Sequence, residues 1–251
     1  MSDYATDLAS IKEVQRKARQ GDLGVWRKEY TRQYRQVLER IYEEIQEEIR
    51  LYLNIPEEGI TCRKGCGTCC AQFVSVPVSH AVLITEYLYA SERAMSTFLH
   101  GYDRWLRCFE NNSQAATVFS RLEEYTASAA AVKHYPQELC IAYHALDVPC
   151  AFLDRGQCSI HAVRPIVCAA YFAVSPPEFC RADSDTLATI LEVAPSQVNL
   201  RKLAELTDPR LSLHQESLPK LVYKLLTIGL PEVVLEVERL FNFQGQNAPK
   251  T

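Results

Sequence analysis

The sequence predicts a mainly α-helical protein, a single helical domain with an irregular, cysteine-rich loop region in its middle. Over most of the chain, apolar residues recur every three or four positions, which is the spacing of an amphipathic helix. Residues 148–180 instead contain four prolines and no sustained helical period. A loop-rich stretch of that length inside a compact domain is usually functional. With 251 residues, of which 47% are hydrophobic, the chain can bury a core without disulfides.

The clearest helix is predicted for residues 26–52. Its apolar side follows the three-and-four spacing and consists of Trp26, Tyr30, Tyr34, Val37, Leu38, Ile41, Ile45, Ile49 and Tyr52. Arg and Glu residues cover the opposite side, so the acidic run at 43–48 is interpreted as a solvated helix face. Asn54, Pro56 and Gly59 are expected to end this helix.

Further elements are expected in order along the chain. Residues 73–78 are short and alternating, which favours an extended segment beside the first cysteines. Pro77 and Ser79 then mark a helix start. Helices are also expected at 92–109, 115–133, 185–193, 196–206, 217–228 and 231–243, before a loose tail. We therefore divide the chain into an N-terminal helical segment (1–60), a cysteine-cluster region (61–182) and C-terminal helices (183–251), packed as one compact domain.

Composition excludes several classes of protein. The net charge of −4 and the pI near 5.9 do not fit a general nucleic-acid binder, which carries a basic excess. No apolar run approaches the ~18 residues of a membrane span. The first ten residues, including Asp3 and Asp7, lack the basic start and apolar stretch of a signal peptide. We therefore expect a cytoplasmic protein without a nucleic-acid or membrane partner. The sequence also has no P-loop, HExxH or GxSxG motif.

Eight of the ten cysteines fall into two groups. The first group is Cys62, Cys66, Cys69 and Cys70, around the turn-forming Gly65 and Gly67. The second group is Cys150, Cys158, Cys168 and Cys180, in the proline-rich stretch. Bunched cysteines in a reducing compartment are more often metal ligands or catalytic residues than disulfides. The sequence therefore predicts an irregular metal-binding loop region built from both groups.

Basic residues accompany these cysteines. Arg63, Lys64, Arg155, Arg164 and Arg181 all lie within four positions of a proposed ligand. Four thiolates on one zinc ion leave a net charge of about −2, which nearby cations would offset. This distribution of charge in an acidic chain supports the metal-site hypothesis.

Five residues need separate interpretation. The adjacent Cys69 and Cys70 are expected to diverge, by ~100° on a helix, and so to serve two metals or one multinuclear centre. Cys108 and Cys140 lie outside both groups in apolar surroundings and are interpreted as small buried hydrophobic residues. His161, between two cysteines of the second group, could replace one of them as a ligand.

These motifs resemble the YkgJ-like cysteine-cluster proteins, a family described as zinc- or iron-chelating. The resemblance rests on Cys62 to Cys70, then on Pro149-Cys150-Ala-Phe-Leu, Cys158-Ser-Ile-His161 and Val163-Arg164-Pro165-Ile-Val-Cys168. It implies that the seven cysteines of these motifs are ligands and that Arg164-Pro165 is the accompanying turn. The chain departs from the family pattern in its first cysteine spacing, and by Ala151, His161 and Ala169 where Pro, Tyr and Arg are usual. A flagellin lysine methylase described as using an iron–sulfur centre is a relative of this family.

Thiolates suit zinc and iron–sulfur clusters about equally, so the predicted cofactor is zinc or iron, with an iron–sulfur cluster as an open alternative. Three functions stay open. In the first, the metal has a structural role, and the helices bind a protein partner. Alternatively, the chain is a metalloenzyme or redox protein that is distantly similar to the methylase, or a metal storage or delivery protein. An enzyme would need an acid or base near the metal. The candidates are His80, His144, Asp147, His161 and Tyr171, each more often an ordinary residue because no two stand at a recognisable spacing.

Overall fold

The structure, a computed structural model, describes residues 4–53, 59–63, 65–128 and 135–246. Within these ranges eleven α-helices dominate, which confirms the prediction of a mainly α-helical protein. They are α1 (Tyr4–Ala18), α2 (Gly21–Leu53), α3 (Val78–Tyr89), α4 (Glu92–Glu110), α5 (Ser113–Ser128), α6 (Gln137–His144), α7 (Ile166–Ala170), α8 (Gln197–Glu205), α9 (Pro209–Leu213), α10 (Leu218–Thr227) and α11 (Leu230–Gln246).

Short elements connect these helices. There are three 3₁₀ helices in the described part of the chain, namely η1 (Thr68–Ala71), η2 (His161–Val163) and η3 (Pro177–Cys180). The strands there are β1 (Ser75–Pro77), β2 (Leu153–Asp154), β3 (Gln157–Cys158), β4 (Tyr171–Ala173), β5 (Ile190–Glu192) and β6 (Gln215–Ser217). They form antiparallel pairs, β1 with β6, β2 with β3 and β4 with β5. These pairs are too small to form a sheet layer, so helix packing determines the architecture.

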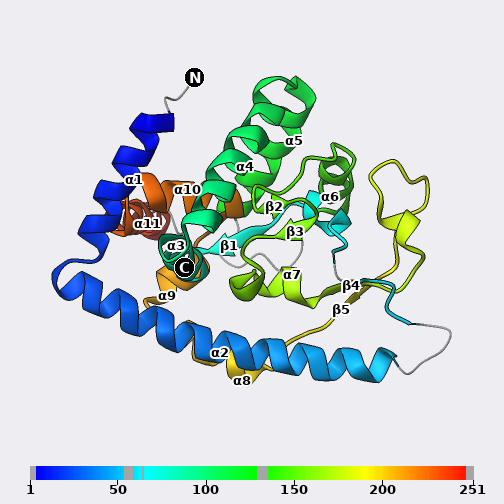
Figure 1. Ribbon diagram of the computed structural model, residues 1–251, viewed down its shortest axis with the longest axis horizontal. Helices are drawn as coiled ribbons and strands as arrows, with labels where there is room; N and C mark the ends of the chain where they lie inside the picture. The colour runs from blue at the N-terminus through cyan, green and yellow to red at the C-terminus, as the bar shows by residue number, and fades with distance from the viewer. Residues whose placement is uncertain (1–3, 54–58, 64, 129–134, 247–251) are drawn as a thin grey trace.

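Helix α2 runs along one side of the molecule, with α8 packed beside it (Figure 1). Its 33 residues include the predicted helix at 26–52, which is confirmed. Most of the predicted apolar side is buried, since Tyr34, Leu38, Ile41 and Ile45 are at most 3% exposed, but Trp26 at its start is exposed. Helix α2 ends at Leu53, directly before the expected stop; of the residues predicted to end it, Asn54 and Pro56 lie outside the described residues and Gly59 does not. Helix α1 precedes α2 and was not predicted.

Helix α3 lies inside the core. Ten of its twelve residues are buried, and it packs against α2, α4 and α10. It begins at Val78, directly after β1, so the extended segment and the helix start expected near Pro77 are both confirmed. Strand β1 pairs with β6, with Ser75 opposite Ser217. The connection between these strands contains the second cysteine group.

The remaining helix predictions are mostly confirmed. Helices α4, α8, α10 and α11 match the predicted ranges to within three residues at each end. Helix α5 corresponds to the prediction at 115–133 as far as residue 128, and residues 129–134 are outside the described ranges. Helices α6 and α9 were not predicted. One hydrophobic core joins these elements, from Ile11 on α1 to Val237 on α11.

The helix predicted at 185–193 is wrong. This stretch contains strand β5, which pairs with β4 so that Tyr171 lies opposite Glu192 and Ala173 opposite Ile190. The apolar residues fit a helical period, but β4 offers backbone groups that pair with this stretch instead. Residues 148–180 contain only short elements, of which the five-residue α7 is the longest, so the prediction of no sustained helix there is confirmed. These residues lie above the C-terminal half of α2 in Figure 1.

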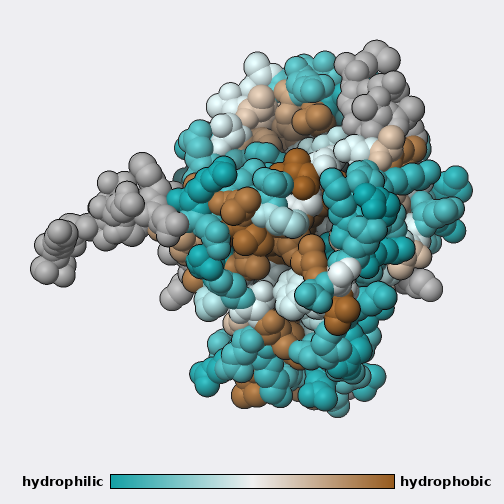
Figure 2. Space-filling model, turned by 90° about the vertical axis from the view of Figure 1, so that its left-hand side faces the viewer, coloured by the Kyte–Doolittle hydropathy of each residue, from teal (hydrophilic) through white to brown (hydrophobic). Residues whose placement is uncertain are grey.

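None of the described helices has both the length and the apolar character needed to cross a membrane. Hydrophobic side chains do gather on one face, in and around a hollow at the end of the molecule where α2 begins (Figure 2). The exposed apolar residues of α2 include Val25 and Trp26.

Candidate metal centre

The first cysteine group lies on the segment that leads from α2 to β1. Thr61 fixes this segment to β4, because its backbone N–H donates to the carbonyl of Ala173 at 2.9 Å. The backbone N–H of Ala173 in turn donates to the sulfur of Cys62 at 3.2 Å. Gly65 has a φ of +87°, which side chains rarely adopt, and this turn leads the chain into η1.

The second cysteine group meets the first through the backbone. The N–H of Cys150 donates to the carbonyl of Cys70 at 2.7 Å. Two residues further on, Phe152 stacks on Phe98 of α4 with ring centroids 4.5 Å apart. Both aromatic rings are fully buried. The segment that carries Cys150 is therefore fixed both to the first group and to the helical core.

Secondary structure also positions the other three cysteines of the second group. Cys158 ends β3, across a two-residue hairpin turn in which Arg155 and Gly156 have φ of +48° and +77°. Cys168 lies in α7, and Cys180 ends η3. These elements lie on three separate short units, so tertiary packing alone brings the sulfurs together.

The charge of Cys69 acts on thiols of both cysteine groups. Burial first, and then the charge of neighbouring thiolates including Cys69, raise the pKa of five cysteines drawn from both groups: Cys62, Cys150, Cys158, Cys168 and Cys180. Cys66 acts in the same way on Cys62 and Cys180. The interaction between two charges weakens as the distance between them grows. The structure therefore brings all eight predicted site cysteines into one region.

The thiols of the adjacent Cys69 and Cys70 act on each other. The interaction with Cys70 lowers the pKa of Cys69, and the interaction with Cys69 is the largest cause of the raised pKa of Cys70. The two thiols are therefore close enough to influence each other's pKa. That the pair serves separate metals or a multinuclear centre stays a prediction.

Arg164 supplies positive charge to the gathered thiols. It adds to the lowered pKa of Cys69 and opposes the rise caused by burial at Cys158 and Cys168. Its guanidinium lies over the ring of Tyr42 at 5.9 Å, and Tyr42 donates its hydroxyl to the carbonyl of Arg164. Among the described residues, Arg164 Nε is buried without a hydrogen-bond partner. Tyr42 was not predicted, because no sequence pattern distinguishes it from other residues of α2.

The other basic residues expected near the thiols behave differently. Arg63 and Arg155 are exposed, and Arg181 forms an ion pair with Asp183 at 2.7 Å. Lys64 lies outside the described residues. Offsetting thiolate charge therefore falls mainly to Arg164 within the described part of the site.

The thiols are open to solvent on one side. Cys62, Cys66 and Cys69 are exposed, whereas the other five are half-buried. In the described ranges, no three His, Cys, Asp or Glu side chains stand in the arrangement of a finished metal site. The thiols are thus gathered without converging on one point, and side-chain rotation would be needed to close them around an ion. The donor set itself fits zinc or iron, since soft sulfur atoms lie together beside a guanidinium.

Of the candidate acids and bases, His80 is a core residue. It is 2% exposed, lies edge-on to Tyr34, and its Nε2 is 3.0 Å from the carbonyl of Val163. Burial lowers the pKa of His80 to about 4, so the ring is neutral near pH 7 and donates to that carbonyl.

Three other candidates lie around the cysteine region. His144 Nε2 is 3.1 Å from the carbonyl of Cys180, and His161 Nε2 is 2.6 Å from Arg164 Nη1. Burial, followed by the charge of Cys69, raises the pKa of Tyr171 to about 12. His144, His161 and Tyr171 therefore lie where they can position the cysteine segments.

The positions of Asp147, Cys108 and Cys140 indicate no role in the candidate metal centre. Asp147 is exposed, with a φ of +49°. Cys108 and Cys140 are half-buried, and Cys108 donates to the carbonyl of Arg104 at 3.4 Å, one turn earlier in α4. Both cysteines are less buried than their apolar neighbours had suggested.

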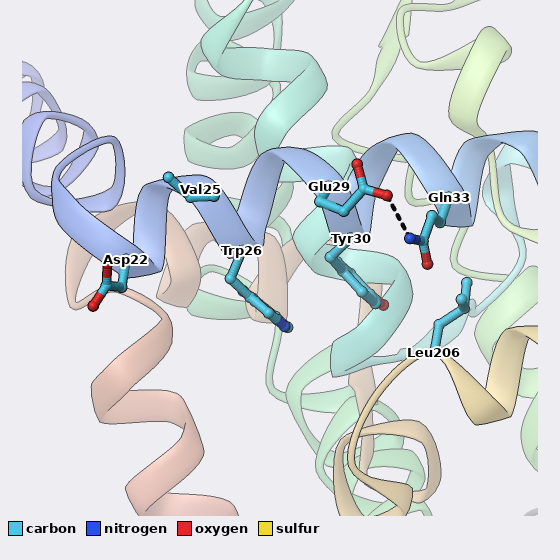
Figure 3. A pocket seen from close by; sticks show the side chains of 7 residues that line it. All are labelled: Asp22, Val25, Trp26, Glu29, Tyr30, Gln33 and Leu206. Atoms are coloured by element: carbon cyan, nitrogen blue, oxygen red, sulfur yellow. Dashed lines mark hydrogen bonds between the residues drawn. The ribbon is translucent and has the colours of Figure 1, made fainter.

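A hollow of about 410 Å³ lies apart from the cysteines, against the N-terminal part of α2 (Figure 3). It is lined by Asp22, Val25, Trp26, Glu29, Tyr30, Gln33 and Leu206. Trp26 and Tyr30 stack with centroids 5.0 Å apart, and Gln33 donates to Glu29. None of its lining residues is a cysteine, so this hollow does not belong to the candidate metal centre.

The helical fold and the gathered thiols together define a class, that of helical proteins with a metal-chelating cysteine cluster. The family model CxxCxxCC, described as "Putative zinc- or iron-chelating domain", matches residues 61–191. The match covers more than half of the chain and includes all eight grouped cysteines. The chain therefore belongs to the CxxCxxCC family, as the motifs suggested. Comparison with curated proteins and with solved structures finds no match.

Proposed function

We propose that this protein holds zinc or iron through its two cysteine groups, and that the metal ties the irregular segment to the helical shell. The hydrogen bond from Cys150 to the carbonyl of Cys70 carries this proposal, because it joins the groups across about 80 residues of sequence. The effect of the Cys69 charge on the pKa of Cys150 and Cys168, which belong to the other group, supports the proposal. The residues that would hold the metal are the eight grouped cysteines.

The metal would act as a Lewis acid that replaces the thiol protons. Burial raises the pKa of the half-buried thiols, so without a cation they stay protonated. A bound cation stabilises the thiolate form, and metal affinity then rises with pH. Arg164 would offset part of the remaining negative charge. All ten cysteines are free, which fits a reducing compartment such as the cytoplasm.

Anaerobic purification with elemental analysis and a visible spectrum tests this proposal. We expect stoichiometric zinc in a colourless protein, or iron with sulfide in a brown one. Cys66→Ser and Cys168→Ala, one from each group, should lose metal and lower the free energy of unfolding, since metal binding is coupled to folding. Cys108→Ala is the matched control and should keep its metal. Full metal content and stability in both site variants would refute the proposal.

A second candidate function, metal delivery, is supported by one observation. Cys62, Cys66 and Cys69 are exposed, so an incoming chelator or acceptor protein could reach the metal from that side. Stopped-flow transfer to a chromophoric chelator separates the two functions. Complete transfer within seconds favours delivery, whereas retention over hours favours a structural role. The spectrum of the purified protein decides whether an iron–sulfur centre, and hence redox or enzymatic chemistry, enters at all.

A further inference from the structure

A second hollow, of about 470 Å³, lies beside the candidate metal centre. We call it the hairpin pocket; it is enclosed by the end of α3, the first turns of α4 and the β2–β3 hairpin. Its wall includes Ser91, Arg93 and Thr97 from the helical side, and Arg155, Cys158 and Ser159 from the hairpin side. Its volume lies within the range of small-molecule sites, about 300–1,000 Å³.

The residues that line the hairpin pocket are mostly polar, and their net charge is positive. Arg93 and Arg155 face it from opposite sides, against one carboxylate, that of Asp154. The pair of Arg155 and Asp154 is long, at 3.9 Å, and the Arg155 side chain is 92% exposed. The Arg155 guanidinium is therefore not held in a tight ion pair and can turn towards a ligand, and Arg93 is exposed as well. Guanidinium groups bind carboxylates and phosphates through paired hydrogen bonds.

The backbone adds two features of the same kind. Ser91 caps α4 by accepting from the N–H of Ala94 at 3.2 Å, so the positive end of this long helix faces the pocket. Arg155 occupies a left-handed position of the hairpin turn, which normally favours Asn, Asp or Gly. Its presence at a disfavoured position points to a role for the side chain itself.

Ser159 offers a hydrogen-bonding group that the protein does not use. Its Oγ is buried and has no hydrogen-bond partner among the described residues. The frame around it is rigid, since Phe98 on α4 stacks on Phe152 just before the hairpin. The helical and hairpin sides of the pocket are therefore held at a fixed separation.

We propose that the hairpin pocket binds a small molecule through its carboxylate or phosphate group, held between Arg93 and Arg155. Because Cys158 forms part of the wall, the bound anion lies next to the candidate metal centre. That adjacency rests on the proposed function, whereas anion binding does not.

Calorimetric titration of the full chain at low salt tests this inference, with inorganic phosphate and succinate as separate probes and putrescine as a cationic control. We expect saturable binding of at least one anion and none of putrescine, and the tighter probe identifies the preferred group. Arg93→Gln and Arg155→Gln should each weaken binding about tenfold, because each removes a charge-assisted contact. Arg201→Gln, an exposed position on α8, removes the same charge elsewhere and should change affinity less than twofold.

Thermal unfolding of each variant, followed by circular dichroism, verifies that the fold is kept. The inference is overturned if neither anion binds saturably, or if both pocket variants bind as tightly as the Arg201→Gln control. Metal analysis of the same samples separates the two proposals. Arginine-dependent anion binding by a chain that never acquires metal would refute the proposed function alone. Stoichiometric metal without anion binding would refute this inference alone.

Discussion

Gly101 lies where helix α4 meets the chain beside Cys150, and replacing it with alanine should loosen that junction. A Cβ at this position would stand 1.9 Å from the carbonyl oxygen of Ala151 and 2.8 Å from its carbonyl carbon. Both are backbone atoms, so no side-chain rotation can relieve the overlap. Ordinary contact requires about 3.5 Å, so the helix and the segment must separate by about 1.5 Å.

The expected cost of Gly101→Ala follows from two opposing effects. Overpacking a buried contact costs about 1–3 kcal/mol, and a clash with fixed backbone belongs at the upper end. Alanine favours the helix over glycine by about 1 kcal/mol. We therefore expect the free energy of unfolding to fall by about 2 kcal/mol. Because Ala151 adjoins Cys150, the proposed metal should also be released at a lower chelator concentration.

Urea unfolding at a fixed metal content measures this change. Asp103→Ala, on the exposed side of the same helix, removes an ion pair with Arg107 between side chains that are more than half exposed. This control should change the free energy of unfolding by less than about 0.5 kcal/mol. If Gly101→Ala proves as stable as the wild-type protein, the close approach of α4 to this segment is wrong.

Three further predictions follow from buried contacts. Phe98→Ala removes a fully buried ring stacked on Phe152 and should cost about 3–5 kcal/mol by urea unfolding; a loss below about 1 kcal/mol would contradict this packing. The pKa of His80 is about 4 in the folded protein, whereas an unperturbed histidine has a pKa of 6.5. Between these two pH values only the unfolded chain therefore binds a proton at His80. The free energy of unfolding should therefore fall as the pH drops from 6.5 to 4. His80→Asn should flatten this part of the pH profile of the melting temperature. An unchanged slope would show that other groups cause the pH dependence. Glu44 accepts hydrogen bonds from Ser196 and Asn199 at the start of α8, so Glu44→Ala should cost about 1–3 kcal/mol and speed amide exchange in α8, while unchanged exchange would argue against this anchor.

Helices with a regular apolar side were predictable from the sequence. The spacing of apolar residues in α2 reports directly on burial, and Leu38, Ile41 and Ile45 are indeed among the most buried side chains. Helix α1 was missed although its Ile11 is 2% exposed. Strand β5 was mistaken for a helix, because its conformation depends on a partner strand about 20 residues earlier in the chain. The local sequence pattern therefore predicts an element whose burial is periodic. It fails for an element whose conformation depends on pairing with a segment far away in the sequence.

For the candidate site, the sequence indicated which residues to consider but not how they meet. The motifs marked both cysteine groups, and the structure brings these groups together. The hydrogen bond from Cys150 to Cys70, and the position of Arg164 over Tyr42, depend on packing between segments far apart in sequence. The mutual effect of Cys69 and Cys70 on their pKa values depends on side-chain rotation, which residue order does not reveal.

The backbone contact between Cys70 and Cys150 has a consequence for how the protein is made. A ribosome adds about 5–20 residues per second, so the second cysteine group follows the first by roughly 4–16 s. During this interval the nascent chain presents one set of thiols without the other. If the proposed function holds, metal binding by both groups is therefore a late event of biosynthesis. Strand β1 can pair with β6 only later still, because β6 is synthesised after both cysteine groups.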